Sequence, residues 1–172
     1  MKHLLVLALP FALAACSPGA DEPASTAAPA PTPAPAPPGS APAPGVAATL
    51  GAHHWRLETA VAADGSRIDA LFANPDAALQ LDFAEGRVSV ANACNAMGGE
   101  FNLDADILAI GPMAGTKRAC ATPLMDMERE AQTRLAGRHA LTLEDGRAPR
   151  LSLANGLGDR LDFVGERRTP AR

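Results

Sequence analysis

The chain has 172 residues and a formal net charge of −4, from 15 basic and 19 acidic side chains. The basic residues form no stripe and aromatic residues make up only 3% of the chain, which excludes a typical nucleic-acid-binding surface. Leaving out the N-terminal region, residues 51–168 have the length and apolar content of one ordinary domain.

The N-terminal region begins with a short basic start and an apolar run from Leu4 to Ala15. Because this run is too short to span a bilayer and ends in small residues, residues 1–15 are predicted to be a secretory signal peptide. The sequence LAAC, ending at Cys16, resembles the bacterial lipobox, in which cleavage after Ala15 leaves a lipidated cysteine. The resemblance implies a lipid anchor in the membrane, and Ser17 favours the outer membrane, with the domain facing the periplasm or the cell surface. An ordinary signal peptide cleaved nearby is the alternative.

The next segment, residues 16–50, is predicted to be a disordered tether that starts at the lipidated cysteine. Ten prolines and eleven alanines fall between Ser17 and Leu50. Such a sequence favours polyproline II and buries too little apolar surface to fold. Fully extended, it would reach about 100 Å, which suits a spacer between membrane and domain.

The rest of the chain is predicted to be mainly β. Alternating apolar and polar residues predict strands at 79–83, 88–91, 141–143, 151–153 and 161–163, with weaker strands near 55–57, 68–72 and 107–110. Asp-Gly, Glu-Gly and Asn-Gly turns between short strands indicate a small antiparallel barrel or sandwich. Residues 169–172 are predicted to be a disordered tail.

One segment, residues 123–136, breaks the strand pattern and predicts a single helix. Thr122 is a candidate N-cap, Pro123 suits the first helical position, and Gly137 suits the C-terminal stop. Apolar residues recur at steps of three and four, so one face of the helix is predicted to pack on the core: Leu124, Met127, Ala131 and Leu135.

Cys94 and Cys120 are the only cysteines of the predicted domain. An even pair in an exported domain favours a structural disulfide. The alternative is a reactive thiol at Cys120, whose pKa Lys117 and Arg118 would lower. Neither cysteine has the histidine and asparagine partners of a catalytic thiol nearby in the sequence, so we expect the disulfide.

Candidate metal ligands are few. His53 and His54 are adjacent and would point to opposite faces of a strand, and His139 stands alone. Asp104 and Asp106 resemble part of a calcium loop but lack its glycine and distal glutamate. We therefore expect neither a metal nor a cofactor.

The predicted helix carries the acidic residues Asp126, Glu128 and Glu130, which are close in sequence to Arg129 and Arg134. This arrangement is typical of a solvated charged face rather than of a catalytic carboxylate pair. The sequence has neither a nucleophile elbow nor a phosphate-binding glycine loop. We therefore expect no enzyme activity and assign no catalytic residue.

Two motifs resemble the signature of META domains, the HslJ-like heat-inducible protein family. The sequence ACNAMGGEF (93–101) is similar to G-C-N-x-x-x-G-x-Y, and GPMAGTKRAC (111–120) is similar to G-x-(M/I)-A-x-T-x-x-A-C. Glu128 falls where the family tends to carry a helical glutamate. The resemblance covers about residues 53–165. Departures are Ala93 for glycine, Phe101 for tyrosine and Gly115 for serine.

The resemblance implies an antiparallel β-barrel-like fold with one helix packed on it, and structural rather than catalytic roles for the signature residues. Asn95 would bond backbone in a turn, Gly99 would permit a bulge or a positive φ, and Thr116 would bond or cap locally. Phe101 and Glu128 are the other signature residues to which the resemblance assigns a structural role. The disulfide would then fix the helix to the sheet.

Family members are associated with heat or envelope stress, antibiotic tolerance and, in some parasites, virulence. We therefore expect a monomeric, non-enzymatic outer-membrane lipoprotein that supports envelope integrity or stress tolerance by contacting an unknown envelope protein. The alternative is a binding module in the periplasm or on the surface, such as a small-ligand carrier or a lysozyme-type hydrolase inhibitor.

Overall fold

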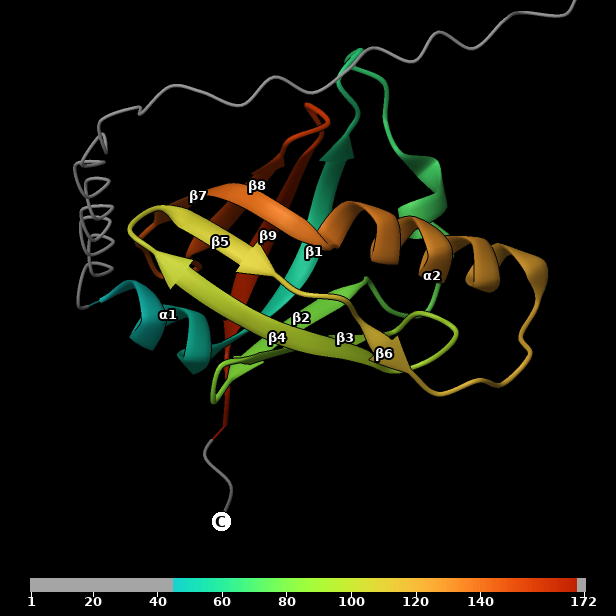
Figure 1. Ribbon diagram of the computed structural model, residues 1–172, viewed down its shortest axis with the longest axis horizontal. Helices are drawn as coiled ribbons and strands as arrows, with labels where there is room; N and C mark the ends of the chain where they lie inside the picture. The colour runs from blue at the N-terminus through green and yellow to red at the C-terminus, as the bar shows by residue number, and fades with distance from the viewer. Residues whose placement is uncertain (1–44, 170–172) are drawn as a thin grey trace, which may run out of the picture. The chain divides into compact units, whose positions relative to one another are not determined.

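The computed structural model describes residues 45–169 (Figure 1), so the predicted signal peptide, Cys16 and most of the predicted tether lie outside the described residues. The helices are α1 (Val46–Ala52), the short 3₁₀ helix η1 (Asp69–Phe72) and α2 (Thr122–Leu135). The strands are β1 (His53–Val61), β2 (Gln80–Ala84), β3 (Arg87–Ala91), β4 (Met97–Asp104), β5 (Ile107–Ile110), β6 (Ala114–Gly115), β7 (Gly137–Glu144), β8 (Arg150–Asn155) and β9 (Arg160–Arg167). None of these helices is long and apolar enough to cross a membrane.

The strands form a closed antiparallel barrel, as predicted. Their order is β3-β2-β1-β9-β8-β7-β5-β4, and pairing of β3 with β4 closes the ring of eight strands. The short β6 pairs with β4 as an extra strand beyond the end of β5. The strands predicted at 79–83 and 88–91 pair as a hairpin, with Leu81 facing Val90, and those predicted at 141–143 and 151–153 pair with Leu141 facing Leu153. Closure leaves no long unpaired edge on the eight strands.

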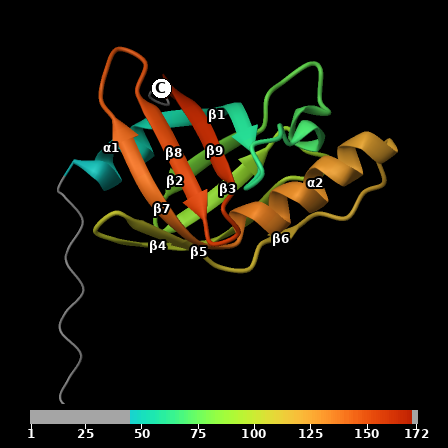
Figure 2. The ribbon, with the colours of Figure 1, turned by 90° about the horizontal axis from the view of Figure 1, so that it is seen from above.

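Alternate strand residues point inward and fill the barrel. The largest fully buried side chains on the strands include Trp55, Phe83, Leu108, Leu151, Leu153 and Phe163. Helix α2 adds Met127, Ala131 and Leu135, three of its four predicted apolar-face residues, all without exposed surface. The two α-helices lie at opposite sides of the barrel in both ribbon views (Figures 1 and 2).

Trp55 shows how tightly the interior is packed. Its indole Nε1 donates a hydrogen bond to the Leu50 carbonyl oxygen at 3.0 Å, and the side chain has no exposed surface. Gly165 makes room for the ring, because a Cβ at that position would lie 3.0 Å from Trp55 and 2.8 Å from Pro149. A side chain at position 165 would therefore force the tryptophan out of place.

The folded part begins earlier than predicted. The sequence predicts a tether up to residue 50, whereas residues 46–52 form α1. The alanine-rich segment VAATLGA has good helix formers, and burial of Leu50 against β1 and β2 supplies the contact that the segment lacks in isolation. The single predicted helix is thus one of two α-helices.

Two local predictions are also wrong. The weak strand predicted at 68–72 is mostly η1, because Leu71 turns inward and η1 contacts α2. The N-cap of α2 is Ala121, which makes no side-chain cap, and Thr122 is already helical. Strand β4, which the strand pattern did not indicate, begins at Met97, where it pairs with β3.

Candidate functional site

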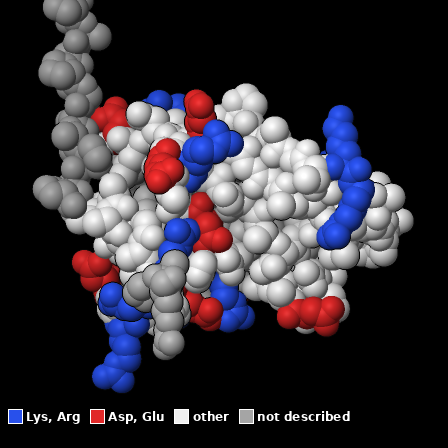
Figure 3. All heavy atoms as spheres, turned by 90° about the horizontal axis from the view of Figure 1, so that it is seen from below, with Lys and Arg blue, Asp and Glu red and all other residues white. Residues whose placement is uncertain are grey.

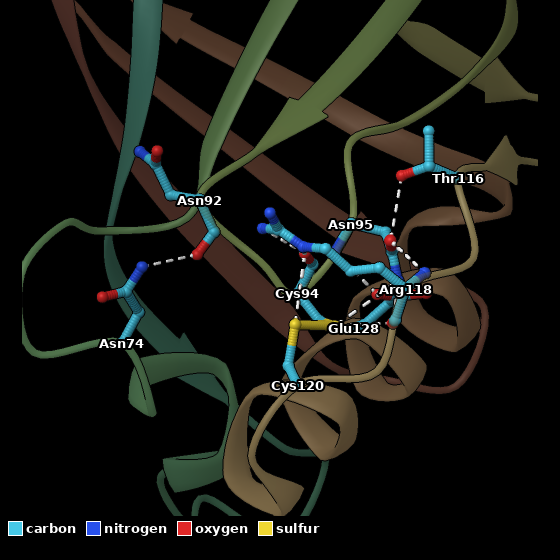
Figure 4. The surroundings of a disulfide bond; sticks show 8 residues. All are labelled: Asn74, Asn92, Cys94, Asn95, Thr116, Arg118, Cys120 and Glu128. Atoms are coloured by element: carbon cyan, nitrogen blue, oxygen red, sulfur yellow. Dashed lines mark hydrogen bonds between the residues drawn. A yellow bond between two sulfur atoms is a disulfide. The ribbon is translucent and has the colours of Figure 1, made fainter.

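The family-like motifs meet where the β3–β4 loop, the strap of residues 111–121 and the start of α2 come together (Figure 4). The predicted disulfide is present here: Cys94 is joined to Cys120, with the two Cα atoms 5.8 Å apart. Cys94 is buried, whereas residues 114–119 of the strap are all exposed. The disulfide therefore fastens an exposed strap, and the helix that follows it, to the barrel.

Asn95 is the centre of a hydrogen-bond cluster and is 6% exposed. Its Nδ2 donates to Glu128 Oε2 at 2.9 Å and to the Arg118 carbonyl at 3.2 Å. Its Oδ1 accepts from Thr116 Oγ1 at 2.9 Å and from the Arg118 amide at 3.0 Å. The amide thus uses all of its usual donors and acceptors to bridge three segments of the chain.

Glu128 and Arg118 complete this cluster. The Glu128 carboxylate also accepts a hydrogen bond from the Asn95 backbone N–H at 2.9 Å. It therefore binds both the backbone and the side-chain amide of Asn95. The Arg118 guanidinium donates twice to the Cys94 carbonyl, at 3.1 and 2.9 Å. Glu128 is therefore not part of a solvated face, although Asp126 pairs with Arg129 at 2.7 Å on the exposed side.

The remaining signature residues serve strand packing. Gly99 has no positive φ; a Cβ there would lie 3.0 Å from the Pro112 carbonyl oxygen and 3.2 Å from that of Gly111. Glycine is needed because the strap crosses β4 closely. Phe101 is half-buried and packs edge-on against Phe83, with ring centroids 5.2 Å apart. Asn95, Thr116 and Glu128 thus form one cluster, and Gly99 and Phe101 lie outside it.

A second polar cluster, which the sequence analysis missed, holds the other end of α2. Asp159 is 5% exposed, forms an ion pair with Arg134, and accepts hydrogen bonds from Asn155 Nδ2 at 3.1 Å and the Ala63 amide at 3.2 Å. Burial raises the pKa of Asp159, but the bonds from Asn155 and Arg134 outweigh it and hold the pKa below its ordinary value. From sequence, Asp159 looks like an ordinary turn acid, so no local signal marks it.

His139 lies beside the same end of α2. Its Nε2 donates to the Leu135 carbonyl at 2.9 Å, and its Nδ1 has no partner among residues 45–169. Burial lowers the pKa of His139 below its ordinary value, against a smaller opposing effect of the Leu135 bond. The ring is therefore neutral at neutral pH and carries the Nε2 proton.

The groups of the first cluster have a structural role, because they hold segments of the chain together. Its cysteines are oxidised, its amide and carboxylate groups are paired with one another, and the bonds join loop, strap and helix. Within residues 45–169 there is no group of three or more histidine, cysteine, aspartate or glutamate residues placed to hold a metal ion. What the arrangement does is fix α2 over the barrel.

The comparison with protein families decides the relationship: the family model described as META domain matches residues 48–168. The chain belongs to the META domain family. The disulfide, Asn95, Thr116 and Glu128 therefore belong to the META domain of this protein and join its two signature motifs.

Solved structures share the fold of this domain. An NMR structure of a protein from Burkholderia xenovorans has a TM-score of 0.60 and 26% identity, and the match covers 78% of this chain and 98% of that one. A second NMR structure, at 19% identity and a TM-score of 0.50, covers 69% of this chain and 94% of that one and shows the same fold. No protein with a curated description matches the chain.

Proposed function

We propose that this protein is a non-enzymatic outer-membrane lipoprotein whose META domain supports envelope integrity and stress or antibiotic tolerance through protein contacts. The observation that carries the proposal is the order of segments in the chain: a lipobox-like LAAC sequence comes first, a proline- and alanine-rich segment follows, and the folded domain begins with α1 at Val46 and the barrel strands from His53. This order suits a domain presented at a distance from a membrane.

The surface of the META domain suits protein contacts. Seen from below (Figure 3), a broad area carries no charged side chains, with basic groups along its right edge and an acidic group at its lower edge. The interior is filled by side chains such as Trp55, Phe83 and Phe163, which leaves a small-ligand carrier without the hollow barrel that it needs. These features favour a protein partner over an internal ligand.

The anchor is tested by metabolic labelling with palmitate and by membrane fractionation. Wild-type protein is expected to take up label and sediment with the outer membrane, and the Cys16→Ser variant is expected to lose both. Unlabelled wild-type protein in the soluble fraction would remove the lipoprotein part of the proposal.

The function is tested in a deletion strain challenged with heat, detergent and a bulky hydrophobic antibiotic. We expect increased sensitivity that is restored by the wild-type gene and not by Cys16→Ser, which keeps the META domain but not the anchor. An intact barrier under all three challenges would refute the role. A lysozyme-inhibition assay with the purified protein separates the hydrolase-inhibitor alternative, which predicts inhibition with no barrier defect.

A further inference from the structure

The outer face of strands β1, β9, β8 and β7 carries a hollow of about 560 Å³ on the surface of the barrel. These four strands lie side by side in Figure 2. The floor consists of short side chains, and longer charged side chains stand around it. The floor is formed mainly by Ala140, Thr142, Ser152 and Ala154; the charged surround includes Glu58, Glu144, Arg150 and Arg160.

The strand registers arrange these side chains in three rows across the sheet. In the central row, Thr142 faces Ser152, and Ser152 faces Asp162. Asp162 accepts hydrogen bonds from Ser152 at 2.7 Å and from Thr59 at 2.8 Å, so this row is held together across three strands. One flanking row runs from Ala140 through Ala154 to Arg160, and the other runs from Glu144 through Arg150 to Val164.

Opposite charges in these rows lie on the two sides of a diagonal line through Ser152. Glu144 on β7 and Arg160 on β9 occupy opposite corners, since Glu144 pairs with the residue two before Ser152 and Arg160 with the residue two after it. Arg150 and Asp162 are also neighbours of Ser152, one along β8 and one across on β9. The remaining two corners of the rows are Ala140 and Val164. A two-fold axis that lies in the face and runs between these corners through Ser152 exchanges Glu144 with Arg160 and Arg150 with Asp162.

We propose that this face binds a second copy of the same chain, with the two sheets packed face to face about that axis. Glu144 of each copy then meets Arg160 of the other, and Arg150 meets Asp162. The strands of the two copies cross steeply, as in orthogonal sheet packing, and the short central side chains let the sheets approach. A surface with this pattern is complementary to itself, which a surface for an unrelated partner has no reason to be.

The two arginines of this face are exposed. Arg150 is 55% exposed and pairs with Glu58, and Arg160 is 61% exposed and lies 3.2 Å from Asp162. These bonds hold both guanidinium groups over the face while leaving donors free, because each guanidinium has five. The proposed dimer differs from the monomer expected from sequence, and it depends neither on the disulfide cluster nor on the proposed envelope function.

The test is sedimentation velocity on residues 16–172 carrying Cys16→Ser, so that no lipid contributes to association. The unaltered face is expected to dimerise. Glu144→Arg and Arg160→Glu, each tested alone, place like charges together twice and are expected to weaken the dimer about tenfold or more. An equimolar mixture of the two variants is expected to dimerise again, because every contact between unlike chains then joins opposite charges.

Matched controls are Arg147→Glu and Glu100→Arg, which reverse exposed charges outside the face and are expected to leave the dimer unchanged. Near-ultraviolet circular dichroism of every variant checks the fold. A protein that stays monomeric at all concentrations, variants that remain dimeric when measured alone, or a mixture that stays monomeric would each overturn the proposal.

Discussion

The two ends of helix α2 are held to the barrel by different chemistry. At the N-terminal end, a disulfide and the Asn95–Glu128 bonds fasten a helix that has no side-chain cap. At the C-terminal end, the Arg134–Asp159 ion pair and the bond from His139 to Leu135 do the same without a covalent link. We therefore expect the first end to respond to reductant and the second to pH, although both position one 14-residue helix.

Removing the disulfide is expected to have the largest effect. The Cys94→Ser, Cys120→Ser double variant loses a cross-link of 26 residues' separation, which costs about 3–4 kcal/mol in the chain-entropy account. Urea unfolding measures the loss. Hydrogen exchange is expected to rise over residues 114–128 and to stay slow near Leu135; equal protection at both ends would show that the two fastenings are not separate.

Asn95→Ala is expected to cost about 2–3 kcal/mol, because it removes the donors and acceptors that bridge Thr116, Arg118 and Glu128. The disulfide stays in place, so this variant measures the polar share of the N-terminal fastening. Asn102→Ala, at an exposed position on β4, is the matched control and is expected to change the unfolding free energy by less than about 0.5 kcal/mol.

Asp159→Asn breaks the fastening at the other end. Because Arg134 is 21% exposed and regains some water, the expected loss is about 1–2 kcal/mol. The pKa of Asp159 is lowered on folding, so its contribution is present above the ordinary value of 3.8 and is lost as the pH falls through the lower folded-state value. Wild-type and variant stabilities, measured by urea unfolding, should therefore converge as the pH falls below 3.8; a constant gap would contradict the assignment.

His139 gives the smallest expected effect and a different pH range. Because burial lowers the pKa of His139 in the folded state, the unfolded chain binds a proton first as the pH falls through 6.5. We expect wild-type stability to fall by up to about 1 kcal/mol between pH 7 and pH 5.5 from this residue. His139→Gln should flatten that part of the pH profile, and an unchanged slope would assign it to other groups.

The strands whose apolar and polar residues alternate could be predicted from the sequence, and so could the family. Leu81 and Phe83 mark β2 because their spacing alone places them on one face, and the two motifs marked the META domain. The strand predicted at 68–72 was wrong because the apolar residues of this segment fit either a strand or a helical turn. Contact with α2, which the sequence does not show, selects the helical turn. The start of α1 was missed because a helix of seven residues depends on the core that receives Leu50.

The polar contacts that hold the two ends of α2 were less predictable than the fold. The bond from Asn95 to Glu128 joins residues 33 apart in sequence, and the ion pair between Arg134 and Asp159 joins residues 25 apart. Charge and spacing within a helix indicate only which residues share a face, so Glu128 looked like its neighbours Asp126 and Glu130. The family motif gave the position of Glu128, and only the three-dimensional structure gives its partner.

The placement of Trp55 beside α1 has a mechanical consequence. A pull on the N-terminal segment reaches the barrel through α1 and then β1, which is hydrogen-bonded to β2 on one side and to β9 along its length on the other. A pull directed along β1 would load these bonds together rather than one after another. The first element to yield would be α1, and the single tryptophan, which bonds the Leu50 carbonyl, would report that event as a change in fluorescence.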